Sequence, residues 1–229
     1  MKRFNHIRVI SFDADDTLWD CQSYFCMVER QYCSLLSAYA SADTVSRELF
    51  RTETANMPLL GYGCKAFTLS LVETAVRLSD GRIPASDIAR IIELGKSLLQ
   101  IPVIPLPGVC ATLDALHAYR LVLFTKGELL DQQNKLRRSG LSPYFEHVEI
   151  VSDKTESAYM SLFSRLGVRP EECLMVGNSF KSDIIPALSA GASAIYVPFH
   201  VTWQLEQTEE FGHERLERVT CFSDIPALL

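Results

Sequence analysis

Three aspartates follow a largely apolar run near the beginning of the chain. The run covers residues 7–12, and Asp13, Asp15 and Asp16 come directly after it. A buried strand that brings carboxylates to its end is costly unless something there needs negative charge. Carboxylate oxygens are ligands for divalent cations, so a cation is the expected partner.

The second half of the chain alternates between strand-like and helix-like segments. Strands are predicted over residues 120–125, 147–151, 173–177 and 193–197, with a further short strand over 219–222, and helices over 109–118, 129–139, 156–166 and 182–190. Strands that alternate with helices predict an α/β fold, a doubly wound, Rossmann-like parallel sheet with right-handed crossovers. Ligands of such a sheet bind outside the carboxyl ends of its strands.

The residues that follow these strands suit the transfer of a phosphoryl group. Thr125 ends the second strand, Lys154 follows the third, and Asn178 and Asp183 follow the fourth. Phosphoryl transfer needs a nucleophile, an acid/base, hydrogen-bond donors and positive charge for the phosphoryl oxygens. Four strand ends together offer this set.

Each of these side chains has an expected role. Asp13 is the candidate nucleophile, which would form an aspartyl-phosphate, and Asp15 is the candidate acid/base. Thr125 would donate its hydroxyl to the phosphoryl group, and Lys154 would hold charge against nucleophile and phosphate. Asn178 and Asp183 would complete the metal site. Lys126 is a candidate substrate contact, although a solvated neighbour of the site is the simpler interpretation.

The ordered set resembles the haloacid dehalogenase superfamily of phosphohydrolases. The segment from Asp13 to Thr17 is similar to its first motif, Thr125 to the second, Lys154 to the third, and 177–183 to the fourth. The resemblance implies Mg²⁺ as cofactor, bound by the Asp13 carboxylate, the Asp15 backbone carbonyl and the fourth motif. Asn178 stands where the family usually has Asp, and it offers an oxygen without charge.

Residues 20–104 read as a helical insertion between the first two motifs. The resemblance implies a cap domain of the first type there, with a core domain of residues 1–19 and 105–229. Tyr62 and Lys65 lie in a glycine-flanked loop that could reach over the active site and touch the substrate. A plain turn between two helices explains this loop equally well.

Composition excludes several classes of partner. The net charge of −6 and the scattered basic residues argue against a nucleic-acid or anionic-membrane surface, and no stretch is long enough to span a membrane. Seven cysteines without a C-x-x-C pair predict reduced thiols and a cytoplasmic location. The Glu-rich segment 205–217 is most simply a solvated helix face.

We therefore expect a Mg²⁺-dependent phosphatase that hydrolyses a small phosphorylated metabolite. Two alternatives share the fold, a phosphomutase and a dehalogenase. The dehalogenase needs neither a metal nor an acid two residues after the nucleophile, so Asp15 and Asp183 count against it. A third alternative is a phosphometabolite-binding regulatory protein with weak catalytic activity. In such a protein the uncharged Asn178 would have cost the site its metal and its turnover.

Overall fold

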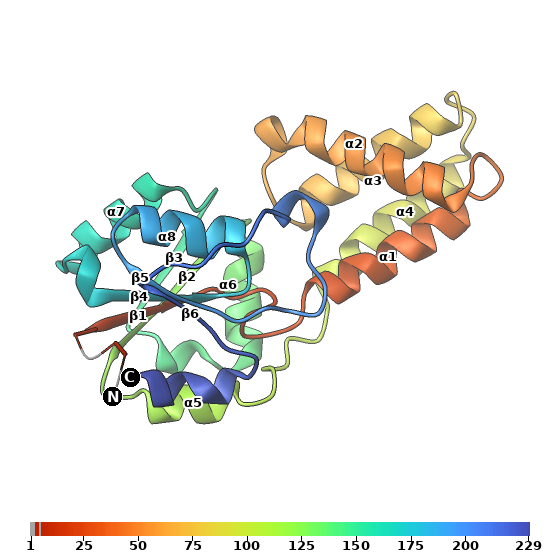
Figure 1. Ribbon diagram of the computed structural model, residues 1–229. Coiled ribbons are helices and arrows are strands. Elements are labelled where there is room, and N and C mark those ends of the chain that lie inside the picture. Colours follow the sequence, from red (N-terminus) through yellow and green to blue (C-terminus); the bar gives the residue numbers. More distant parts are fainter. Residues whose placement is uncertain (1–2, 5) are drawn as a thin grey trace. The chain divides into compact units, whose positions relative to one another are not determined.

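The computed structural model describes residues 3–4 and 6–229 (Figure 1). The chain divides into two compact units, one of Met1–Asp20 with Val103–Leu229 and the other of Cys21–Pro102. Their roles as catalytic core and cap stay predictions.

The first unit is built on a six-stranded parallel sheet, which confirms the predicted fold class. The strand order is β3-β2-β1-β4-β5-β6. The strands are β1 (Val9–Phe12), β2 (Arg120–Lys126), β3 (His147–Val151), β4 (Cys173–Gly177), β5 (Ser193–Tyr196) and β6 (Leu216–Arg218). The order places β1 between β2 and β4, so the carboxyl end of β1 has a strand end on either side.

Helices cover both faces of this sheet. Figure 1 shows α7 (Glu156–Leu166) and α8 (Ile185–Ser189) on one face and α5 (Val109–Ala115) on the other. The remaining α-helix of the described part of this unit is α6 (Leu129–Ser139). All four residues of β1 are buried, as expected for a strand covered on both faces. Phe124 of β2 packs edge-on against Tyr159 of α7, with ring centroids 4.8 Å apart.

Two segments differ from their predicted structure. The helix predicted over 182–190 begins as a π-helix, Phe180–Ile184, before α8. A short strand was expected at residues 219–222, but the edge strand is β6, three residues earlier. Phe222 instead begins a 3₁₀-helix, Phe222–Leu228, and its ring lies 5.9 Å from that of Phe12 in the core. Burial of this aromatic ring explains why the chain leaves the sheet there.

The second unit consists of four helices: α1 (Gln22–Leu35), α2 (Ala42–Leu60), α3 (Cys64–Leu78) and α4 (Ala85–Leu98). Tyr32 of α1 is fully buried and donates its hydroxyl to the Leu71 carbonyl of α3 at 2.7 Å. Gly95 of α4 lies against Thr68, where a β-carbon would come within 1.9 Å of the threonine hydroxyl, so α3 and α4 approach closely. Pro58 does not interrupt α2, which continues to Leu60.

All seven cysteines are reduced thiols outside any disulfide, which agrees with the prediction. Four of them are buried and pack as small apolar residues, whereas Cys110 and Cys221 are exposed. A cytoplasmic location stays a prediction. Within the described part of the chain, no helix has the length and apolar character needed to cross a membrane.

Candidate active site

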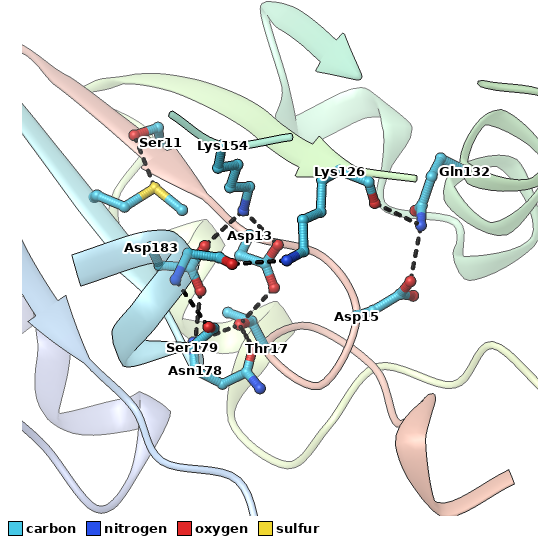
Figure 2. Close-up of polar contacts among 12 residues, drawn as sticks. Ser11, Asp13, Asp15, Thr17, Lys126, Gln132, Lys154, Asn178, Ser179 and Asp183 are labelled. Carbon is cyan, nitrogen blue, oxygen red and sulfur yellow. Dashed lines mark hydrogen bonds and ion pairs between the residues drawn. The ribbon is translucent and has the colours of Figure 1, made fainter. Parts of the chain in front are cut away.

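Asp13 follows β1 directly and is buried at the carboxyl end of the sheet. Its backbone N–H donates to the Val176 carbonyl of β4 at 2.9 Å, which continues the strand pairing up to the acid. Thr17 donates its hydroxyl to Oδ2 of Asp13 at 3.0 Å, and Lys154 Nζ lies 2.6 Å from Oδ1 (Figure 2). Both carboxylate oxygens of Asp13 therefore have a donor.

Lys154 joins the first and fourth motifs. Its ammonium is almost fully buried and lies 2.6 Å from Oδ1 of Asp183 as well as from Asp13. Burial alone would lower the pKa of Lys154, but the two carboxylates outweigh this effect and raise it. Burial also raises the pKa of Asp13 to about 7, because Lys154 offsets it only in part and Asp183 adds repulsion.

The residue after Lys154 starts the next helix. Thr155 is the N-cap of α7 and accepts a hydrogen bond from the Ala158 N–H at 3.2 Å. An N-cap side chain satisfies one of the otherwise unpaired N–H groups of the first helical turn. Local capping thus accounts for the threonine at this position and fixes the backbone next to Lys154.

The fourth motif folds around Asp183. Oδ2 of Asp183 accepts the Ser179 N–H at 2.9 Å, while its Oδ1 faces Lys154. Gly177 lies so close that a β-carbon there would be 2.2 Å from Oδ2 of Asp183. The glycine at the end of β4 therefore makes room for this buried carboxylate.

Asn178 lies beside the groups that the family resemblance implies as metal ligands. With its amide turned so that the nitrogen faces Asp13, this nitrogen is 3.2 Å from Oδ2 of Asp13 and 3.1 Å from the Asp15 backbone carbonyl. The opposite orientation presents the amide oxygen to the same place. Oxygen donors from a carboxylate, a carbonyl and an amide are the set that Mg²⁺ prefers, so these residues fit a magnesium ion.

The candidate metal site would use a backbone carbonyl and an amide oxygen in addition to carboxylates. Among residues 3–4 and 6–229, no three or more His, Cys, Asp or Glu side chains are grouped so that they could hold a metal. The other oxygen groups that would face a cation next to Asp13 are the carbonyl of Asp15 and the amide of Asn178.

The Asp15 side chain is held on the other side of its loop. It accepts hydrogen bonds from Trp19 Nε1 at 2.7 Å, Gln132 Nε2 at 2.7 Å and Lys135 Nζ at 2.9 Å. Burial would raise the pKa of Asp15, but Lys135 and the hydrogen bonds outweigh it and lower the pKa. Asp16, to which no chemistry was assigned, is a turn residue with a φ of 64°.

The end of β2 supplies the remaining two candidates in this unit. Thr125 is buried next to the last residue of the strand. Lys126 Nζ donates to the Ser182 hydroxyl at 2.7 Å and pairs with Glu206 at 2.5 Å. The solvated position considered for Lys126 is therefore wrong, because its side chain is only 15% exposed.

The two candidates from the helical insertion lie in the other unit. Tyr62 is half-buried in the loop between α2 and α3, and Lys65 is exposed in the first turn of α3. Their contact with a substrate stays a prediction.

Sequence reasoning missed several polar residues of the site. Thr17 belongs to the first motif, and its spacing of four residues from Asp13 was an available signal. Gln132 and Lys135 share one face of α6, which also carries Asp131, and all three are buried. Lys135 pairs with Asp131 at 3.3 Å as well as with Asp15. Glu206 was assigned to a solvated helix face, whereas its side chain is 11% exposed and pairs with Lys126.

The parallel sheet and the charged groups at its carboxyl edge define a class of enzyme. The family model of the haloacid dehalogenase-like hydrolases matches residues 7–191. The match covers most of the chain, so the protein belongs to this family of hydrolases, and the resemblance drawn from the motifs is confirmed.

Several individual proteins are similar over nearly the full length. The chain is 28% identical over 231 residues to the glyceraldehyde 3-phosphate phosphatase of Methanothermobacter thermautotrophicus, covering 97% of this chain and 98% of that protein. It is 25% identical to the pyrimidine 5'-nucleotidase YjjG of Escherichia coli, with 93% and 97% covered. A crystal structure of a haloacid dehalogenase-like family hydrolase from Xanthomonas campestris superposes with a TM-score of 0.87 at 37% identity, covering 97% of this chain and 90% of that one.

Proposed function

We propose that the protein is a Mg²⁺-dependent phosphatase that hydrolyses a small phosphate monoester through an aspartyl-phosphate on Asp13. One observation carries the proposal. Asp13 lies at the carboxyl end of β1, and its Oδ1 is 2.6 Å from Lys154 Nζ. The Asp15 carbonyl and the Asn178 amide lie next to it, and these groups together fit a cation. A carboxylate nucleophile needs positive charge beside it to meet an anionic phosphate.

The residues around Asp13 would orient its carboxylate and bind the phosphoryl group. Lys154 holds the nucleophile in place through the hydrogen bond to Oδ1, and its charge favours the approach of phosphoryl oxygens. Thr17 fixes the other oxygen. The Thr125 hydroxyl at the end of β2 would donate to the phosphoryl group.

Asp13, the Asp15 carbonyl and Asn178 would hold the magnesium ion, with Asp183 beside them. A bound Mg²⁺ supplies charge that keeps a carboxylate ionised and neutralises phosphoryl oxygens. Asp13 needs such a charge beside it, because burial raises its pKa and favours the protonated form when no metal is bound.

Asp15 is the proposed acid/base. Its carboxylate is ionised and bound to Lys135 and Gln132, so it is ready to accept a proton as a base. To act as the acid it must first turn away from these donors and take up a proton, which it then gives to the leaving-group oxygen. The loop from Asp13 to Trp19 keeps its backbone in place during this rotation, since Trp19 is fully buried and its carbonyl accepts the Asp16 N–H at 2.7 Å.

The relatives support the proposed substrate class. Those that align over most of both chains are named as phosphatases of glyceraldehyde 3-phosphate or of pyrimidine 5'-nucleotides, and both substrates are small phosphate monoesters. Tyr62, in the loop between α2 and α3, and Lys65, in the first turn of α3, would contribute to the choice among such molecules.

A panel of phosphorylated sugars, trioses, nucleotides and short acids tests the proposal. Phosphate release at saturating Mg²⁺ from at least one of them, and loss of that release with a chelator, is the expected result. Exchange of phosphate between sugar phosphates would indicate a mutase, and halide release from haloacids without Mg²⁺ would indicate a dehalogenase. Phosphometabolite binding without turnover would favour a regulatory protein.

A further inference from the structure

Glu206 brings a carboxylate to the edge of the site from a segment without a strand. It ends the short 3₁₀-helix Gln204–Glu206, between β5 and β6. Its Oε1 pairs with Lys126 Nζ at 2.5 Å, and its Oε2 accepts the hydroxyls of Ser179 at 2.5 Å and Ser182 at 2.6 Å. Three donors from two strand ends therefore converge on one side chain.

The position of these donors follows from the order of the sheet. Lys126 ends β2, whereas Ser179 and Ser182 follow β4, and β1 lies between these strands. The hydrogen bond from Lys126 to Ser182 thus spans the carboxyl end of β1, where Asp13 lies. Figure 2 shows Lys126 and Asp13 at the carboxyl ends of the neighbouring strands β2 and β1.

An ammonium and two hydroxyls around one carboxylate form a set of donors that also suits phosphoryl oxygens. Both kinds of anion accept short, charge-assisted hydrogen bonds from the same groups. Ser182 precedes Asp183 directly, and both Ser179 and Ser182 are buried, so the donors are fixed beside the proposed reaction site. The donors end or follow the two strands that flank β1, so they lie at the same edge of the sheet as a phosphoryl group on Asp13 would.

We infer that Glu206 is an internal anion that competes with the phosphoryl group of substrate and product for Lys126, Ser179 and Ser182. The inference rests on the proposed function and deepens it by assigning a phosphate-binding set and its competitor. The ion pair must open for an anion to bind, and its closure drives the anion out. Glu206 thereby limits the affinity of the site for inorganic phosphate, the product.

The direction of the change in phosphate affinity on substitution of Glu206 distinguishes this role from a structural one. Glu206→Gln keeps the size of the side chain and removes its charge, so Glu206 no longer competes as an anion for the Lys126 ammonium. We expect the variant to bind inorganic phosphate about tenfold more tightly than the unchanged protein, because one ion pair that competes with phosphate is lost. A residue that merely braces the segment would leave phosphate binding unchanged or weaken it.

Calorimetric titration of inorganic phosphate into the full-length protein with Mg²⁺ tests the inference. Glu206→Gln should tighten binding, Lys126→Met should weaken it, and in the double variant the effect of Glu206→Gln should disappear. Glu210→Gln is the matched control from the same segment, because Glu210 bonds to Tyr196 and Arg218 instead. It should bind phosphate as the unchanged protein does.

Two results would overturn the inference. One is a folded Glu206→Gln variant whose phosphate affinity is unchanged or lower. The other is a Lys126→Met variant that binds phosphate as tightly as the unchanged protein, and this arm remains available if Glu206→Gln fails to fold. Either result leaves the proposed function intact if the panel shows phosphate release, so the two failures are distinguishable.

Discussion

Lys154 shares one buried ammonium between Asp13 and Asp183, at 2.6 Å from each. Lys154→Met would leave two buried carboxylates without this cation. Removing one partner of a buried ion pair costs about 3–5 kcal/mol of unfolding free energy. We expect a loss of that size in urea unfolding, and a larger loss at higher pH, because the pKa of Asp13 is raised to about 7 and its carboxyl carries no charge at low pH.

Lys96→Met is the matched control for this experiment. Lys96 pairs with Glu93 on the surface of α4, and exposed pairs contribute about 0–1 kcal/mol. Equal losses of stability in both variants would show that the Lys154 pair does not hold the site together.

Asn178 determines how much negative charge meets the cation. Asn178→Asp adds a carboxylate next to Asp13 and the Asp15 carbonyl, so we expect the Mg²⁺ concentration for half-maximal activity to fall roughly tenfold. Asn134→Asp, at a half-buried position of α6 where the side chain accepts a hydrogen bond from Arg137, adds the same charge away from the site and should leave that concentration unchanged. An unchanged Mg²⁺ requirement in Asn178→Asp would show that Asn178 is not a ligand.

At the scale of elements, the junction of β4 with the π-helix places Asp183. In Gly177→Ala the new β-carbon would lie 2.2 Å from Oδ2 of Asp183, so the carboxylate must move away from Lys154. A displacement of about 1 Å in an active site costs on the order of 100-fold in turnover. Gly212→Ala, which has open space around its β-carbon, is the control for steady-state assays. Full activity of Gly177→Ala would contradict this account of the junction.

The pair of helices α1 and α2 carries a second pH-sensitive feature. Burial, with added repulsion from Glu29 on α1, raises the pKa of Glu53 on α2 from 4.5 to about 8. The folded state then keeps a proton that the unfolded chain releases above pH 4.5, so stability falls as the pH rises from there to about 8. The total loss should be roughly 1–3 kcal/mol after screening by solvent.

Urea unfolding at several pH values checks this prediction. Glu53→Gln should become more stable relative to the unchanged protein as the pH rises, whereas Glu93→Gln, an exposed acid of α4, should not. Parallel curves for Glu53→Gln and the unchanged protein would show an ordinary pKa for Glu53.

For the molecule as a whole, the periodicity of the sequence predicted the sheet and the residues at its strand ends. Asp13, Lys154 and Asp183 meet because parallel strands bring their carboxyl ends to one edge, a rule that applies without coordinates. The rule says nothing of groups that reach this edge from elsewhere. Glu206 does so from an irregular segment, and Lys135 does so from the buried face of a helix.

The direction in which a side chain points also could not be predicted from the sequence. Asp15 follows β1 at the expected spacing, yet its carboxylate turns toward α6, where Gln132 and Lys135 compensate its charge. Only tertiary packing decides which of several donors an acid finds. The same holds for β6, whose position depends on where the Phe222 ring enters the core.

A covalent phosphoryl group on Asp13 is the central claim, and acid quenching with a ³²P-labelled substrate measures it directly. With the best substrate of the panel, the protein should retain acid-stable, hydroxylamine-labile label on the peptide that contains Asp13. Asp13→Asn should lose both label and turnover while remaining folded. Asp16→Asn, at a left-handed turn position that asparagine tolerates, should keep them. Turnover without label, or full activity of Asp13→Asn, would contradict the claim.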